Sequence, residues 1–83
     1  MKLFLVTFDI DLTQFLCNAK DEKEAVEMAH EANIVVGEVD EYDMDKLNYN
    51  DYSVESVDFN LLAEMFRRND YWGCTGNVVV FSN

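Results

Sequence analysis

The sequence predicts an α+β fold: a four- to five-stranded, largely antiparallel sheet with two helices packed on one face. The chain has 83 residues, 49% of them hydrophobic, so it can bury one core, and we expect a single domain over residues 1–83. Apolar runs typical of strands are separated by two segments of helical periodicity. Their order (strand, strand, helix, strand, strand, helix, strand) favours antiparallel pairing between neighbours.

The first two strands are predicted to form a hairpin. Residues 3–8 (LFLVTF) are apolar on both alternating faces, which is typical of a central strand covered on two sides. The carboxylates of residues 9–12 favour a turn. Residues 13–19 then alternate between two faces, with Phe15, Cys17 and Ala19 on one of them, as the second strand of the pair should.

A capping box predicts the start of the first helix. Asp21 is followed three residues later by Glu24, and each carboxylate can accept a hydrogen bond from an amide of the first turn. Apolar residues recur at the spacing of one helix face: Ala25, Met28, Ala29 and Ala32. Glutamates line the opposite side: Glu24, Glu27 and Glu31. Asn33 tolerates a left-handed backbone, so we expect the helix to end there.

The second half of the chain predicts two further strands before a second helix. Residues 34–36 (IVV) predict a short buried strand, with a bend at Gly37. Residues 41–51 are interpreted as a long loop or an irregular hairpin. Residues 52–57 alternate and predict another strand.

The second helix is expected to begin at Asp58 or Asn60. Its apolar positions are Phe59, Leu62, Met65 and Phe66. Arg67 and Arg68 fall in its last turn, where cations oppose the negative end of the helix dipole. Residues 69–73 break the helix, and the β-branched run Val78–Phe81 predicts a closing strand.

The charge distribution is the strongest functional signal in the sequence. The net charge is −11, and residues 38–58 carry only one base, Lys46, against a dense set of acids: Glu38, Asp40, Glu41, Asp43, Asp45, Asp51, Glu55 and Asp58. Such a surface repels nucleic acid and anionic lipid, so neither is expected as a direct partner. It favours a basic protein partner, and many basic surfaces in a cell bind nucleic acid.

One short motif resembles that of an enzyme family. Residues 5–13 (LVTFDIDLT) resemble the opening signature of haloacid-dehalogenase-type phosphatases, and this resemblance implies a nucleophile at Asp9 and a general acid at Asp11. That family needs a doubly wound sheet with further Ser, Thr, Lys and Asp elements, for which this chain is too short. We therefore interpret Asp9 and Asp11 as turn residues and predict that the protein is not an enzyme; magnesium-dependent phosphatase activity would support the alternative.

No metal or cofactor is predicted. Asp43 and Asp45 begin like a calcium loop, but the sixth position of that loop is Asn48 instead of Gly. His30 is the only histidine, and we expect it to make a surface or dipole contact near the end of the first helix.

The two cysteines are expected to be reduced, as in a cytoplasmic protein. Cys17 alternates with core residues, which predicts a buried apolar role, whereas Cys74 falls in a glycine-flanked loop. The opening apolar run is only as long as a strand, so no membrane span or leader is predicted.

In its length, its acidity and its strand–strand–helix opening with residues 20–25 (KDEKEA), the chain resembles small phage-encoded proteins such as anti-CRISPR inhibitors and other DNA mimics. The similarity is one of type, so no residue role is transferred. It implies a non-catalytic inhibitor that acts in the host cell cytoplasm by occupying a basic, nucleic-acid-binding surface of a partner such as a CRISPR effector or another host defence protein. The predicted partner-binding residues are acids and the aromatics near them: Asp40, Glu41, Tyr42, Asp43, Asp45, Tyr49, Asp51, Tyr52, Glu55 and Trp72.

The alternative is a protein–protein adaptor or assembly module. In this hypothesis Tyr71, Trp72 and the strand Val78–Phe81 make a sheet-edge contact, and acidity serves only solubility. Salt separates the two hypotheses, because screening acts over about 8–10 Å and weakens charge-driven binding much more than strand pairing.

Overall fold

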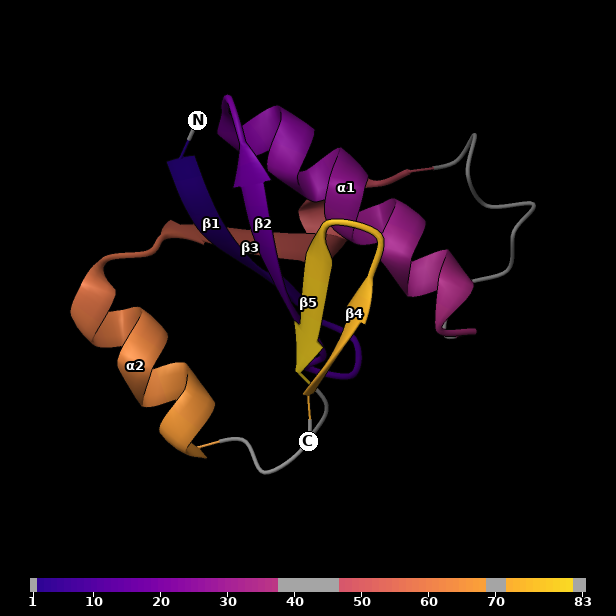
Figure 1. The fold of residues 1–83 in the computed structure, drawn as a ribbon. Helices are drawn as coiled ribbons and strands as arrows, with labels where there is room; N and C mark the ends of the chain where they lie inside the picture. Colours follow the sequence, from indigo (N-terminus) through magenta and orange to yellow (C-terminus); the bar gives the residue numbers. More distant parts are fainter. Residues whose placement is uncertain (1, 38–46, 69–71, 82–83) are drawn as a thin grey trace.

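A computed structural model describes residues 2–37, 47–68 and 72–81 (Figure 1). The described residues form an antiparallel sheet in the order β3-β1-β2-β5-β4. Its strands are β1 (Lys2–Phe8), β2 (Gln14–Ala19), β3 (Tyr52–Ser56), β4 (Trp72–Thr75) and β5 (Val78–Phe81). The helices are α1 (Glu22–Val35), the short 3-10 helix η2 (Tyr49–Asp51) and α2 (Phe59–Arg68). The predicted α+β class and antiparallel sheet are confirmed.

The predicted hairpin of β1 and β2 is present at the centre of the sheet. Its pairing runs from Lys2 opposite Ala19 to Thr7 opposite Gln14. β3 pairs with β1 on the outer side, and β5 pairs with β2. β1 and β2 therefore occupy the interior of the sheet, as their apolar character predicts.

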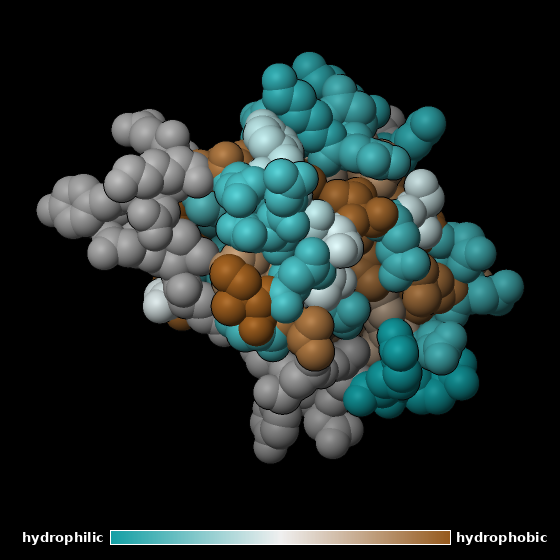
Figure 2. Space-filling model, turned by 180° about the vertical axis from the view of Figure 1, so that it is seen from behind, coloured by the Kyte–Doolittle hydropathy of each residue, from teal (hydrophilic) through white to brown (hydrophobic). Residues whose placement is uncertain are grey.

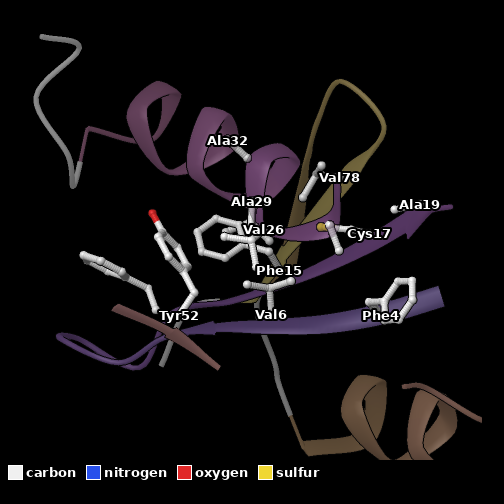
Figure 3. Close-up of a cluster of buried hydrophobic side chains, with 13 residues drawn as sticks. Phe4, Val6, Phe15, Cys17, Ala19, Val26, Ala29, Ala32, Tyr52 and Val78 are labelled. Atoms are coloured by element: carbon white, nitrogen blue, oxygen red, sulfur yellow. The ribbon is translucent and has the colours of Figure 1, made fainter. Parts of the chain in front are cut away.

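The two helices cover opposite faces of the sheet, so the prediction that both pack on one face was wrong. Phe4, Val6 and Phe8 of β1 belong to the core under α1, which Figure 3 shows between the sheet and that helix. The intervening Leu5 packs in a second core with Met65 of α2. Successive side chains of a strand point to opposite faces, and the apolar residues on both faces of β1 each need a cover. The prediction that residues 3–8 are covered on two sides is confirmed.

α1 begins as predicted but ends later. The Asp21 carboxylate accepts a hydrogen bond from the Glu24 amide at 2.8 Å, and the Glu24 carboxylate accepts one from the Lys20 amide at 3.2 Å. The helix then continues through Val35, so the strand predicted at residues 34–36 is absent and Asn33 is a buried helical residue. The left-handed conformation falls at Gly37, with φ 84°. Ala32 and Asn33 are buried against the sheet, and the helix extends beyond them to Val35, which is 66% exposed, so the apolar run at residues 34–36 is not buried as predicted either.

The C-terminal half contains one strand that the sequence did not predict. The Asp58 carboxylate accepts a hydrogen bond from the Leu61 amide at 2.8 Å, which confirms Asp58 as the start of α2. Phe59, the first apolar position of this helix, is 82% exposed. β4 lies where a helix break and a loop were expected, and it forms a hairpin with β5. β4 is only four residues long (WGCT) and contains one glycine, and its one partner strand in the described sheet is β5.

Candidate protein-binding surface

The structure describes half of the predicted partner-binding residues. Five of them, Asp40, Glu41, Tyr42, Asp43 and Asp45, lie outside the described residues, as does Tyr71 of the alternative hypothesis. The described ones are Tyr49, Asp51, Tyr52, Glu55 and Trp72.

Tyr52 is a core residue and not part of the surface. Its side chain is 8% exposed and faces α1. The hydroxyl lies 2.7 Å from Nδ1 of His30 and accepts a longer hydrogen bond, 3.4 Å, from Nδ2 of Asn33. Burial raises the pKa of this hydroxyl. His30 is 5% exposed, so the surface role predicted for it was also wrong. Strand alternation directs Tyr52 inward, toward the same face as Val54.

Tyr49 joins the acidic face of α1. Its side chain is 42% exposed, and its hydroxyl donates a hydrogen bond to Oε1 of Glu27 at 3.2 Å. Partial loss of solvent and the Glu27 carboxylate both raise the pKa of this hydroxyl, so it stays protonated as a donor. An aromatic ring from the acidic half of the chain is thereby placed beside the glutamates of α1.

The exposed side of α1 is mostly anionic. Glu22, Glu27 and Glu31 are exposed, and so is one base, Lys23, which lines a shallow hollow together with Glu22 and Tyr49. Among the described residues the ion pair on this helix joins Lys20 to Glu24 at 3.9 Å, near its N-terminus. Arg67 and Arg68 lie at the end of α2, the helix on the opposite face of the sheet, and do not neutralise α1. We call Glu22, Glu27, Glu31 and Tyr49 the α1 surface.

The two other described acids of the prediction are Asp51, in η2 with Tyr49, and Glu55, in β3. The Asp51 carbonyl accepts a hydrogen bond from the Asp9 amide at 2.8 Å, which places Asp51 at the end of the sheet beside the β1–β2 turn. The Asp9 carboxylate accepts a hydrogen bond from the Ser53 hydroxyl, 2.9 Å from each oxygen. Glu55 pairs with Leu5 and therefore faces the α2 side. No group of three His, Cys, Asp or Glu side chains within the described ranges could hold a metal ion.

Trp72 is exposed at the edge of the sheet. It begins β4, is 54% exposed, and contacts Phe66 edge-to-face with ring centroids 5.3 Å apart. β5, predicted as the edge of the sheet, lies between β2 and β4, so the free edge on this side is β4. Figure 2 shows hydrophobic residues in small separate patches among hydrophilic ones on the face seen from behind.

Two exposed apolar residues were overlooked in the sequence. Ile10 and Leu12 occupy the β1–β2 turn and are 72% and 58% exposed. The segment was interpreted only as turn-forming carboxylates. The available signal was two large aliphatic side chains where Gly, Asn, Asp or Ser would be usual.

The hollows of the described surface are open and shallow. One of about 420 Å³ lies between the C-terminal half of α1 and the β4–β5 hairpin, and it is lined by Met28, Glu31, Ala32, Val35, Thr75, Gly76, Asn77 and Val78. Glu31 is its one charged lining residue among those described.

Cys17 is buried as predicted, and burial raises its pKa to about 12. Cys74 is exposed.

Comparison of the chain with models of protein families, with curated proteins and with solved structures finds no match. In the part of the chain that the structure describes, no helix has the length and apolar character needed to cross a membrane. Function is therefore inferred from the residues themselves.

Proposed function

We propose that this protein is a non-catalytic inhibitor that binds a basic, nucleic-acid-binding surface of a partner protein. The observation that carries the proposal is the α1 surface, on which the exposed Glu27 accepts a hydrogen bond from the Tyr49 hydroxyl and the exposed Glu31 follows one helical turn later. Carboxylates would compete with phosphate for lysine and arginine, and the ring adds the apolar contact that interfaces depend on. Nucleic-acid-binding partners of this kind act in the cytoplasm, so we expect the protein in the same compartment.

Charge spacing defines how closely the α1 surface resembles DNA. Glu27 and Glu31 are one helical turn apart, about 6 Å along the axis. Duplex DNA carries one charge per ~1.7 Å of axis. The α1 surface is therefore sparser than a duplex and acts by attracting a basic groove and filling it, with the net charge of −11 increasing the association rate.

The test is a pull-down from a bacterial lysate at low and moderate salt, followed by elution with a short DNA duplex. The variant Glu27→Gln/Glu31→Gln removes two charges from the α1 surface while its amide oxygens can still accept the Tyr49 hydrogen bond. The control Asp58→Asn/Glu64→Gln removes the same charge from exposed residues elsewhere, and asparagine can still cap α2. We expect the wild type and the control to retain nucleic-acid-binding proteins at low salt that DNA elutes, and the α1 variant to lose them.

Equal retention by both variants, or bound proteins that DNA does not elute, would contradict the proposal.

A second function is favoured by one observation, the exposed Trp72 on the free edge strand β4. An adaptor that pairs through β4 predicts retention that is unchanged by salt and lost in Trp72→Ala.

A further inference from the structure

The β1–β2 turn displays two large aliphatic side chains on a hydrogen-bonded backbone. Ile10 and Leu12 are 72% and 58% exposed. The Phe8 amide donates to the Thr13 carbonyl and the Leu12 amide donates to the Phe8 carbonyl, both at 2.8 Å. The Asp11 carboxylate accepts a hydrogen bond from the Thr13 amide at 3.0 Å. These hydrogen bonds fix the backbone that carries both side chains before any partner binds, which lowers the backbone entropy lost on binding.

Leu12 occupies its position at a conformational cost. Its φ is 66°, the one positive φ among the non-glycine residues described. Glycine or asparagine adopts this conformation with little strain, whereas leucine does not. A buried leucine could offset that strain by packing in the core, but this side chain is mostly in solvent. Folding alone therefore does not account for leucine at this position.

The residues around the turn define what could contact it. Asp9 and Asp11 flank Ile10 on either side and are exposed, and Asp51 adjoins Asp9 through the backbone hydrogen bond at 2.8 Å. The turn thus presents an apolar centre with an anionic border. A second copy of the chain would bring like charges together, and an anionic lipid surface would be repelled in the same way.

We propose that the β1–β2 turn inserts Ile10 and Leu12 into an apolar pocket bordered by lysine or arginine on a partner protein. This inference rests on the proposed function and deepens it, because it supplies an apolar anchor for the basic partner. The aliphatic side chains provide contact area, and Asp9 and Asp11 select a cationic border around the pocket.

Two synthetic peptides of equal length and charge test the proposal, one alternating lysine with leucine and one alternating lysine with serine. Binding to the full chain is measured by fluorescence anisotropy at low and moderate salt. We expect the wild type to bind the leucine peptide about tenfold more tightly than the serine peptide, a difference typical of burying apolar side chains. In Ile10→Ser/Leu12→Gly this preference should disappear while the weaker, salt-sensitive binding of both peptides remains. The control Phe59→Ser, at a side chain that is 82% exposed on α2, should keep the preference.

Urea unfolding of each variant checks that it is folded. We expect the turn variant to stay folded, because glycine relieves the strain at position 12. A preference that survives in Ile10→Ser/Leu12→Gly, or that is lost equally in Phe59→Ser, would overturn the inference and leave the proposed function standing. Absence of low-salt binding of either lysine peptide to the wild type would overturn both. A wild-type dimer in sedimentation that the turn variant abolishes would assign the turn to a second copy and also overturn the inference.

Discussion

Nδ1 of His30 lies 2.7 Å from the Tyr52 hydroxyl, so one buried polar contact joins α1 to β3. The hydroxyl also accepts a hydrogen bond from Asn33, and it can donate its own proton to His30. Side chains far apart in sequence thereby determine how the helix lies on the edge of the sheet. The apolar neighbours of this contact have no comparable directional preference.

Removal of the Tyr52 hydroxyl is expected to destabilise the fold. Tyr52→Phe keeps the ring in contact with Phe8, at a centroid distance of 5.1 Å, but leaves the buried polar groups of His30 and Asn33 without this partner. We expect a loss of about 1–3 kcal/mol in the free energy of unfolding, measured with urea. Tyr49→Phe, which removes an exposed hydroxyl, is the control and should change stability by less than about 0.5 kcal/mol. Equal losses in the two variants would show that burial does not set the cost.

Glycine at position 12 should not destabilise the protein. Leu12→Gly removes the strain of a positive φ, about 1–2 kcal/mol, against an entropic cost of about 0.5–1 kcal/mol for glycine. We expect a urea midpoint equal to or above that of the wild type. Leu12→Val should lower it, because a β-branched residue is poorly tolerated at φ 66°. A marked loss of stability in Leu12→Gly would mean that the side chain contributes to folding after all.

Deletion of the Met65 side chain should weaken the attachment of α2. Met65 is 0% exposed and packs with Leu5, Leu16 and Phe81 on the second face of the sheet. Met65→Ala should cost about 2–5 kcal/mol, the usual range for emptying such a site. Phe59→Ala, on the exposed side of the same helix, should stay within about 0.5 kcal/mol of the wild type. Similar values for the two variants would contradict the packing of α2 against the sheet.

The two thiols should differ in reactivity. Burial raises the pKa of Cys17 to about 12, so at pH 8 its nucleophilic thiolate is scarce and inaccessible, whereas Cys74 is exposed. With a chromogenic disulfide reagent we expect rapid reaction at Cys74 and slow reaction at Cys17, the latter becoming rapid in urea. Cys74→Ser should abolish the rapid phase. A rapid phase that persists in this variant would show that Cys17 is accessible.

Stability should also fall at high pH. The pKa of Cys17 is raised from 9.0 to about 12 on folding, so above pH 9 the unfolded chain loses a proton that the folded chain retains. The free energy of unfolding then decreases by up to ~1.4 kcal/mol per pH unit from this thiol, and the effect ends near pH 12. Cys17→Ala removes the contribution of the thiol, although Tyr52, whose pKa is raised in the same direction, still contributes above pH 10. An unchanged slope in Cys17→Ala would show that Cys17 is not the source.

Local sequence determined much of this protein. The apolar run of β1, the alternation of β2, the capping carboxylate of Asp21 and the helix start at Asp58 depend on neighbours within a few residues, and each was predictable. The acidity of the outer face of α1 follows from the helical spacing of Glu27 and Glu31 in the same way. Local hydrogen bonds and periodicity are enough to predict a helix start or a strand, because both depend on residues within one helical turn or one strand.

Tertiary contacts decided the rest. Whether Ile34 and Val35 extend a helix or form a strand, whether α2 covers the first or the second face, and whether Trp72 begins a strand all depend on partners distant in the chain. His30 and Tyr52 are unremarkable polar residues in the sequence and become a buried pair only when α1 packs across β3. The exposure of Ile10 and Leu12 likewise follows from the direction in which the hairpin places them. Burial is a property of the packed whole, so the residues available to a partner were determined by the fold.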